Sequence, residues 1–372
     1  MPFKEIFCQD KAIDLLQRAY NSGRSAHAYI FAGPEGVGKF KTACEWAGLL
    51  LCHDPVVVND FADSCGRCRS CQLFEAGAHP DFNHIYKELR EFTEDGKGKG
   101  PPVDLPIDVV REFLIAKVSI RPSLSRRKIF VVSEAERLNA SSQNSLLKIL
   151  EEPPLYCCIV LLCTRLDKLL PTIKSRSQII RFGPIAEQKI SDSLKQMALD
   201  DQRAKYFARL AEGSLGTACQ WAKLELSEAG LYQAKKELMN SLAGFEYTKV
   251  LDLANELLGK GKKIADVWAE LDKGRSKTDI HRRALKSLIQ MLISAFQDVM
   301  KLNLRPAEEA INFDQKEQID KLARRFDPEQ SAQKITDCYR MLHWIESSVN
   351  ERLIFEHLLL SLADSDTMRV YR

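Results

Sequence analysis

Short apolar runs alternate with helical patterns over the first half of the chain. Between residues 26 and 182, five such runs are bounded by polar or turn-forming positions, which is typical of buried strands. The expected strands are residues 29–32, 82–86, 128–132, 159–163 and 178–182. Because helical patterns separate them, the sequence predicts an α/β domain with a five-stranded parallel sheet covered by helices.

The pattern changes after Gly183 and Pro184, where no further β-rich run occurs and one helical pattern follows another. Residues 183–228 have room for a small three-helix unit. Residues 229–372 contain longer amphipathic helices, in which apolar side chains such as Leu285, Leu288 and Leu292 recur at three- and four-residue steps. The sequence therefore predicts three domains, at 1–182, 183–228 and 229–372.

Composition and charge narrow the class of protein. The chain has 372 residues, of which 45% are hydrophobic and 28% charged, as in ordinary globular proteins. Lys and Arg total 54 against 51 Asp and Glu, so any contact with nucleic acid must come from a local patch, and a histone-like role is excluded. A polar insertion at residues 94–102 has too little apolar content to pack and predicts a mobile surface loop.

No membrane span is expected, because the longest apolar run, residues 155–163, is well short of the ~20 residues that a spanning helix needs. The first residues lack the pattern of a signal peptide, so we expect a cytoplasmic protein without disulfides.

A glycine-rich segment follows the first expected strand and precedes a helical pattern. Its sequence, GPEGVGK, places Gly33, Gly36, Gly38 and Lys39 where a phosphate-binding P-loop requires them. Backbone N–H groups and the helix N-terminus would face an anion there, and the lysine would reach the outer phosphates. The alternative is a glycine-rich turn without a ligand.

The magnesium-binding half of such a site is degraded. The P-loop pattern next requires Ser or Thr, and the chain has Phe40, which offers no oxygen; Thr42 should point away. Ser133 replaces the Asp expected after the strand at 128–132, and Glu134 stands where a catalytic base would be. We therefore expect a P-loop domain that does not hydrolyse ATP on its own. These residues do not decide whether the chain still binds ATP or ADP.

Four cysteines form a second motif. Cys65, Cys68 and Cys71 have two-residue spacers, and Cys52 lies 13 residues upstream, so four thiolates can converge on one tetrahedral zinc ion. Four protein ligands leave no open position, which predicts a structural zinc knuckle at residues 52–71. Independently buried thiols or an iron–sulfur cluster are the alternatives. His79 is expected to be a turn residue and not a further ligand.

These motifs together resemble the clamp-loader subunits of bacterial DNA polymerase III. The resemblance rests on the P-loop, the cysteine cluster inside its domain, and residues 27–29 (HAY), 144–154 (NSLLKILEEPP), 175–177 (SRS) and 349–353 (VNERL). It spans essentially the whole chain. It implies an AAA+ core, a small helical lid at 183–228, and a helical collar at 229–372 that assembles with four other subunits into a ring.

Within that family the chain resembles the delta-prime type more than the ATP-hydrolysing motor subunits, gamma and tau. Phe40 and Ser133 support this choice. So does Gly216, which stands where the motor subunit carries an arginine that touches the γ-phosphate. The length also fits, because tau would need long additional domains.

The resemblance also implies a role for Arg176. In the family, a Ser-Arg-Cys motif supplies an arginine finger to the ATP site of the adjacent motor subunit. Ser175 and Arg176 match this motif, and Ser177 replaces the cysteine. The alternative is a helix C-terminal cation beside the last carbonyls. The basic run at 126–128 is expected to be a solvated loop, with a DNA contact as the alternative. Residues 151–154 are expected to end a helix without a catalytic role.

The sequence thus predicts a non-hydrolysing subunit of the machine that loads the sliding clamp onto primed DNA. The implied partners are the motor (gamma or tau) and delta subunits, and the clamp and DNA are reached through the assembled complex. The alternatives are a motor subunit, which would require magnesium binding without help from Phe40 or Ser133, and a zinc-containing DNA-binding module.

Overall fold

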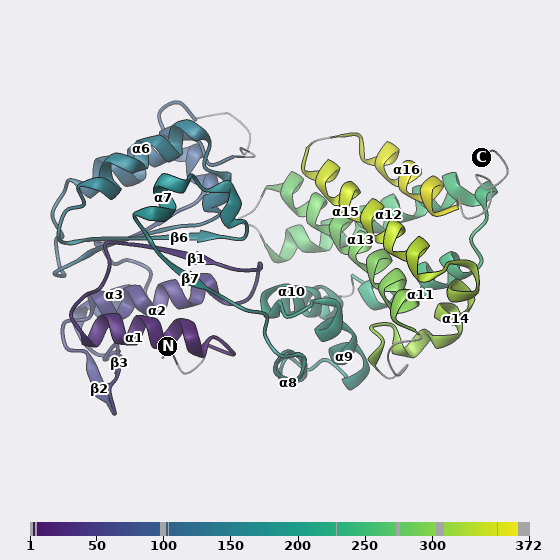
Figure 1. Ribbon diagram of the computed structural model, residues 1–372, viewed down its shortest axis with the longest axis horizontal. Helices are drawn as coiled ribbons and strands as arrows, with labels where there is room; N and C mark the ends of the chain where they lie inside the picture. Colours follow the sequence, from purple (N-terminus) through teal and green to yellow (C-terminus); the bar gives the residue numbers. More distant parts are fainter. Residues whose placement is uncertain are drawn as a thin grey trace. The chain divides into compact units, whose positions relative to one another are not determined.

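The computed structural model describes residues 3, 6–96, 102, 104–227, 229–272, 276–302, 309–347 and 349–363. The chain divides into two compact units, Met1–Lys189 with Gly213–Gly216, and Ile190–Glu212 with Thr217–Arg372. The first contains the sheet, and the second is built from helices (Figure 1). Residues 97–101, most of the predicted polar insertion, lie outside the described residues. The three domain boundaries expected from the sequence stay predictions.

Five parallel strands form the central sheet of the first unit in the order β4-β5-β6-β1-β7. They are β1 (Ala28–Ala32), β4 (Phe82–Ile85), β5 (Lys128–Val132), β6 (Cys157–Cys163) and β7 (Gln178–Arg181). Every neighbouring pair is parallel, so the predicted sheet is confirmed. The strand ends differ from the expected ones by one or two residues at most. Because the strands are parallel, the loops that follow them lie along one edge of the sheet.

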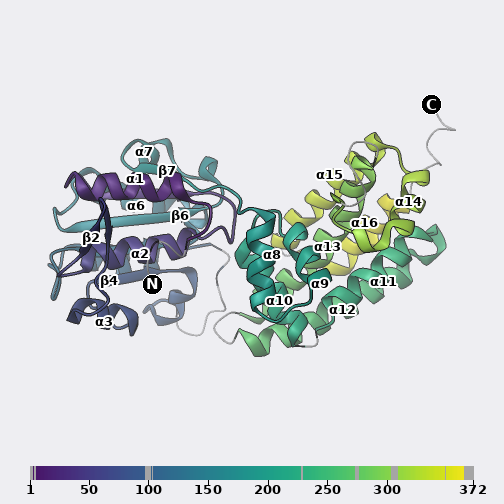
Figure 2. The ribbon, with the colours of Figure 1, turned by 90° about the horizontal axis from the view of Figure 1, so that it is seen from below.

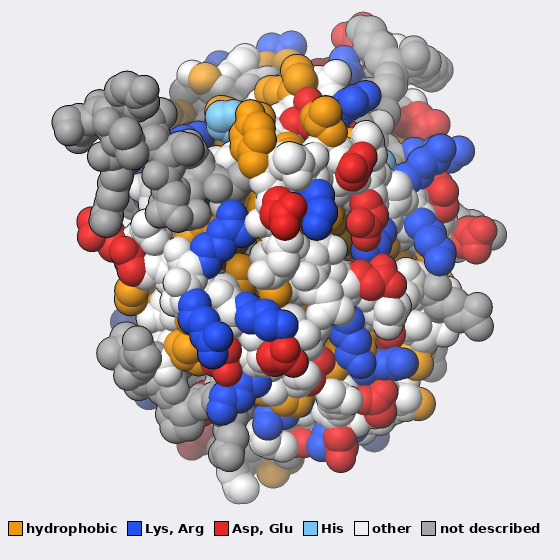
Figure 3. Space-filling view, turned by 90° about the vertical axis from the view of Figure 1, so that its right-hand side faces the viewer, with side chains coloured by type: hydrophobic (Ala, Val, Ile, Leu, Met, Phe, Trp, Pro, Cys, Tyr) orange, Lys and Arg blue, Asp and Glu red, His pale blue; other side chains and the backbone are white. Residues whose placement is uncertain are grey.

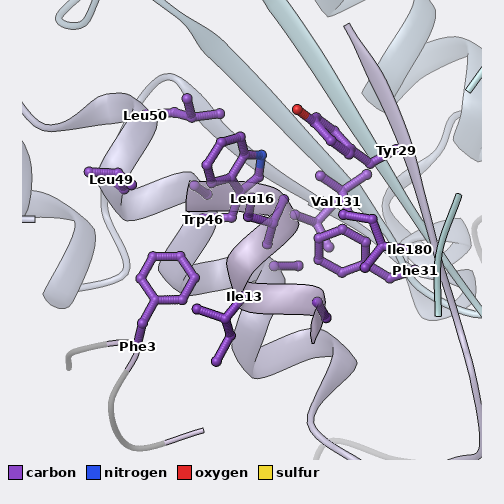
Figure 4. Close-up of a cluster of buried hydrophobic side chains, with 14 of the residues drawn as sticks. Phe3, Ile13, Leu16, Tyr29, Phe31, Trp46, Leu49, Leu50, Val131 and Ile180 are labelled. Atoms are coloured by element: carbon purple, nitrogen blue, oxygen red, sulfur yellow. The ribbon is translucent and has the colours of Figure 1, made fainter. Parts of the chain in front are cut away.

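Side chains from alternate positions of the strands pack against helices on each face. One face packs against α1 (Asp10–Asn21) and α2 (Lys39–Leu51). On this face Tyr29 of β1 meets Trp46 of α2, with 5.7 Å between ring centroids, and Leu16 of α1 joins the same cluster (Figure 4). Burial of both faces explains why the strands read as continuous apolar runs.

The opposite face is covered by α6 (Ala140–Glu151), α7 (Pro171–Ser175) and a helical segment at residues 107–118. That segment consists of α4 (Ile107–Val109), the π-helix η3 (Val110–Ile115) and α5 (Ala116–Val118). Figure 1 shows α6 and α7 on one side of the sheet and α1 and α2 on the other. Among the described residues of this unit, 3-10 turns also lie at η2 (Lys87–Phe92), η4 (Ala135–Arg137) and η5 (Leu166–Lys168).

A small hairpin and a short helix follow α2. The hairpin joins β2 (Val56–Val58) to β3 (Phe61–Asp63), and α3 spans Arg69–Glu75. The Gln17 side chain on α1 fixes β3: its Nε2 donates to the Ala62 carbonyl, and its Oε1 accepts from the Ala62 N–H, both at 2.8 Å. The sequence did not predict this hairpin.

The second unit is helical, as expected. The helices in the described part of this unit are α8 (Glu187–Gln196), α9 (Asp201–Leu210), α10 (Leu215–Leu226), α11 (Leu231–Ala243), α12 (Val250–Leu271), α13 (Lys277–Lys301), α14 (Lys316–Arg325), α15 (Pro328–Glu346) and α16 (Glu351–Ala363). The helices α8 and α10 begin in the first unit. The 3-10 turns η6 (Tyr247–Lys249) and η8 (Phe313–Gln315) also lie in this part of the chain. Figure 2 shows α8, α9 and α10 gathered in the segment where three helices were predicted. Leu285, Leu288 and Leu292 of α13 are buried, which confirms their amphipathic pattern. None of the described helices has the length and apolar character of a membrane-spanning segment.

Candidate functional site

The glycine-rich segment lies between β1 and α2, as the sequence predicts. Gly33 follows β1, and Lys39 is the first residue of α2. Gly36 and Gly38 have φ of 72° and 100°, a backbone conformation that residues with a side chain rarely adopt. The structure therefore brings together the four predicted P-loop residues at the N-terminus of a 13-residue helix.

The Lys39 side chain folds onto this loop. Its Nζ donates to the carbonyls of Gly33 and Pro34, at 2.6 and 2.5 Å. Burial lowers the pKa of Lys39, although Glu136 and Glu35 nearby favour the charged form. The ammonium group would have to leave these carbonyls to contact a phosphate.

His84 contacts both residues at which the sequence departs from the magnesium-binding P-loop pattern, Phe40 and Ser133. Phe40 stacks on His84, with 4.7 Å between ring centroids, and His84 Nε2 lies 2.8 Å from the Ser133 hydroxyl oxygen. His84 lies on β4 and Ser133 directly follows β5, and these strands are neighbours in the sheet. Burial lowers the pKa of His84 to about 4, so the imidazole is neutral at neutral pH. Magnesium requires oxygen ligands, and Phe40 has none, while the Ser133 hydroxyl is already hydrogen-bonded.

Sequence reasoning found Phe40 and Ser133 and missed His84. A histidine near the C-terminal end of a strand beside the Ser133 strand was the available signal. The sequence alone does not place this histidine beside Ser133, because that requires knowing that β4 and β5 are neighbours.

Two further polar residues near the loop have structural partners. Glu134, at the position of a catalytic base, lies 3.3 Å from Arg137 Nε and 3.8 Å from Lys87 Nζ. The buried Thr42 hydroxyl donates to the Gly38 carbonyl at 3.0 Å, in agreement with the expectation that it points away.

Gly216 lies against the P-loop. Its N–H donates to the Gly36 carbonyl at 2.8 Å, and a Cβ added at Gly216 would lie 2.9 Å from the Gly36 Cα. An arginine at position 216 would therefore require the loop or α10 to shift.

The four predicted zinc ligands converge. The Sγ atoms of Cys52, Cys65, Cys68 and Cys71 all lie within 4.8 Å of one another. The Cys52 Sγ is 3.6, 4.0 and 3.5 Å from those of Cys65, Cys68 and Cys71, close to the roughly 3.8 Å edge of a tetrahedron with Zn–S bonds of about 2.3 Å. The donor set and its spacing thus fit a zinc ion, which would hold this segment together as a structural cross-link.

Local backbone geometry supports thiolates in this cluster. Cys52 is the C-cap of α2 and Cys68 the N-cap of α3, so both ends of the knuckle are fixed by helices. Burial opposes ionisation of Cys68, but N–H groups of Cys71 and His53 donate to its sulfur and lower its pKa to about 6. Cys68 therefore favours the ionised form that binds metal, whereas burial raises the pKa of Cys52 and of Cys71.

His79 lies outside the sulfur cluster, as expected, but it is more than a turn residue. Its side chain is buried, and its Nε2 lies 2.9 Å from the Ser70 hydroxyl, which donates to the Leu51 carbonyl at 2.7 Å. Burial lowers the pKa of His79. Its Nδ1 accepts the Asp81 N–H at 3.1 Å. This chain of hydrogen bonds joins α3 and the end of α2 to the start of β4.

Arg176 is the C-cap of α7, and about a third of its side chain is exposed. Its Nη2 lies 2.9 Å from Glu151 Oε1 at the end of α6, and its Nη1 donates to the Thr172 carbonyl at 3.3 Å. The contact with a helix carbonyl is the one expected of a helix-terminal cation. The contact with Glu151 was not expected. Residues 151–154 do end α6, as predicted.

The basic run at 126–128 does not form a patch of three exposed cations. Arg126 is exposed, but Lys128 is buried, and its Nζ donates to the Ile120 carbonyl at 3.1 Å. The solvated-loop interpretation therefore holds for only part of this run.

The fold and site define a P-loop protein of the AAA+ class with an inserted four-cysteine knuckle and a helical C-terminal region. Family models described as "DNA polymerase III, delta subunit" and "DNA polymerase III, delta subunit, C terminal" match residues 8–186 and 278–364. The chain belongs to the delta-prime family of DNA polymerase III clamp-loader subunits.

Three curated relatives illustrate the extent of this similarity. The chain is 25% identical to DNA polymerase III subunit delta' of Bacillus subtilis, over 96% of each chain. It is 38% identical to the delta' subunit of Pseudomonas aeruginosa over 52% of this chain and 53% of the relative. It is 25% identical to the tau subunit of Bacillus subtilis over 98% of this chain and 62% of that subunit.

Proposed function

We propose that the chain is a delta-prime-type subunit that does not hydrolyse ATP and acts on the ATP site of a neighbouring subunit. In this proposal Arg176 is an arginine finger, supplied in trans to a motor subunit of the gamma or tau type. The chain assembles with that motor subunit and a delta subunit in the cytoplasm. The complex uses ATP to load the sliding clamp onto primed DNA during replication.

The contact of Phe40 and Ser133 with His84 carries the non-hydrolysing part of this proposal. In phosphoryl transfer, magnesium neutralises the charge that develops on the transferred group. Here an aromatic ring stands where the first oxygen ligand is needed, and His84 hydrogen-bonds the hydroxyl that replaces the aspartate. The glycine cradle and Lys39 persist, so nucleotide binding and nucleotide hydrolysis are separate questions for experiment.

The placement of Arg176 supports its role as a finger. About a third of its side chain is exposed, at 36%, on the short helix that precedes the edge strand β7. A guanidinium presents paired N–H donors that match phosphate oxygens. It can therefore stabilise charge on a nucleotide held by another subunit.

The zinc knuckle has a structural role in this proposal. The ion would be coordinated by four thiolates, which leaves no position for a water molecule or substrate. The chain's own part is to fix those thiolates between α2 and α3, so that metal binding stabilises residues 52–71.

The formal net charge of +3 does not favour a zinc-containing DNA-binding module. On the face shown in Figure 3, Lys and Arg side chains are interspersed with Asp and Glu. Exposed pairs such as Lys321 with Glu317, at 2.7 Å, show the same mixing along one helix. Binding to DNA without partners would require a basic surface that neutralises several phosphates.

The test uses the isolated chain and the reconstituted complex. The purified chain should show no magnesium-dependent ATP hydrolysis above that of a Lys39→Ala control, and it should co-purify with motor and delta subunits. Nucleotide binding is measured separately with ADP, with and without magnesium. Turnover that disappears in Lys39→Ala would contradict the non-hydrolysing role, and failure to assemble would contradict membership of the complex.

A further inference from the structure

Arg176 and Glu151 lie at the ends of two helices that are linked by hydrogen bonds. Glu151 is the last residue of α6, and Arg176 caps α7. Gln143, which is buried on α6, accepts the N–H of Leu170 at 2.8 Å, and Leu170 is the N-cap of α7. The Gln143 side-chain nitrogen, Nε2, donates to the Lys168 carbonyl at 3.2 Å. The two charged side chains are therefore presented by a rigid pair of helices.

Only some of the N–H donors of the Arg176 guanidinium have hydrogen-bond partners. It has five N–H groups. Nη2 pairs with Glu151 Oε1 at 2.9 Å, and Nη1 donates to the Thr172 carbonyl at 3.3 Å and the Ser175 hydroxyl at 3.4 Å. Among the described residues, Nε has no hydrogen-bond partner. These contacts restrain the plane of the group and leave donors for another ligand.

We propose that Glu151 is a positioning residue for Arg176. Its carboxylate holds the flexible arginine in one orientation before the finger meets the phosphate of a neighbouring subunit, so less rotamer freedom is lost at that step. This proposal rests on the proposed trans role of Arg176. It assigns to the Glu-Glu-Pro-Pro segment a function beyond ending α6.

The size of the effect follows from the exposure of the pair. The side chains of Arg176 and Glu151 are 36 and 50% exposed, so water screens their attraction. Loss of Glu151 should therefore slow ATP hydrolysis by the complex by about two- to five-fold, as expected from the small free energy of an exposed ion pair. The loss of Arg176 itself should cost more, because it removes the group that contacts the phosphate.

The test is a double-mutant cycle in the reconstituted complex, with wild type, Glu151→Ala, Arg176→Ala and the double variant. The readout is primed-DNA-stimulated ATP hydrolysis, with kcat and KM separated. Glu151→Ala should lower kcat by about two- to five-fold with KM for ATP unchanged, and should have no further effect when Arg176 is absent. Glu152→Ala is the matched control, because Glu152 forms no ion pair among the described residues.

Glu151→Gln keeps an oxygen that accepts a hydrogen bond, so it should recover part of the lost rate. Thermal unfolding and subunit assembly of each variant check that the fold is retained. An unchanged rate in Glu151→Ala, with a reduced rate in Arg176→Ala, would overturn the positioning role and leave the finger role intact. The positioning role would also be overturned if Glu151→Ala lowered kcat equally in the wild-type chain and in Arg176→Ala. An unchanged rate in Arg176→Ala would overturn the finger role itself, and the positioning role with it.

Discussion

His84 and Ser133 are joined across two neighbouring strands by a hydrogen bond of 2.8 Å between Nε2 and Oγ. Phe40 covers the same imidazole from the first turn of α2. The two residues that depart from a working P-loop site are therefore held together by a third, His84. His84 thus links these two positions, and Phe40 remains 44% exposed.

His84 should make the stability of the protein depend on pH. Burial lowers its pKa from 6.5 to about 4, so between these values the unfolded chain binds a proton that the folded chain does not. The free energy of unfolding should consequently fall as the pH drops from 6.5 towards 4, with about 2 kcal/mol lost at pH 5 from this residue. Urea denaturation at pH 7 and pH 5 measures the effect.

In His84→Gln, the free energy of unfolding should fall between pH 7 and pH 5 by about 2 kcal/mol less than in wild type. His343→Gln, which alters an exposed histidine of α15, is the control and should behave as wild type. Identical pH dependence in wild type and His84→Gln would show that His84 is not held neutral by burial.

Zinc should be present at about one equivalent in protein purified without chelators, because the four sulfurs have tetrahedral spacing. Cys68→Ser removes one ligand, and should weaken metal binding by more than the roughly 10- to 100-fold that loss of an outer partner costs. Metal analysis and limited proteolysis of residues 52–71 report the change. Cys219→Ser, on α10 and outside the cluster, should retain the metal. Wild-type protein without zinc, and with the segment still resistant to protease, would exclude a structural metal here.

Gly216→Ala should destabilise the first unit despite alanine's better helix propensity. The new Cβ would lie 2.9 Å from the Gly36 Cα, so backbone must shift, at a cost of about 1–3 kcal/mol. Thermal unfolding should show a lower midpoint than in wild type. Gly183→Ala is the control, because a Cβ there meets nothing within 4 Å. A midpoint for Gly216→Ala at or above that of the control would mean that residue 216 does not press on the P-loop.

Features with a local sequence signal were predictable. The five strands are apolar because helices cover both faces of the sheet, and the P-loop and cysteine ligands have fixed spacings. The hairpin was missed because Val56–Val58 is exposed throughout, so it shows no alternation of buried and exposed positions.

Features that depend on packing between distant segments were not predictable. His84 meets Ser133 only because β4 pairs with β5, and 49 residues separate the two in sequence. Glu151 reaches Arg176 because α6 and α7 are fastened through Gln143. Lys128 was read as part of a basic run, but it is buried because it begins a central strand and its amine reaches a nearby carbonyl.

Arg176 is proposed to act on ATP bound by another subunit. The most direct measurement compares wild-type, Arg176→Ala and Arg126→Ala complexes for primed-DNA-stimulated ATP hydrolysis and for clamps loaded. Arg126 is an exposed arginine of a loop and serves as the matched control. Trans fingers contribute ~10³ to 10⁵ in rate in well-studied cases. In the proposed complex several motor sites would act together, so the loss should be clear but smaller than that factor. Arg176→Ala should reduce hydrolysis and loading, with normal assembly and zinc content. Wild-type rates in an assembled Arg176→Ala complex would contradict the finger role.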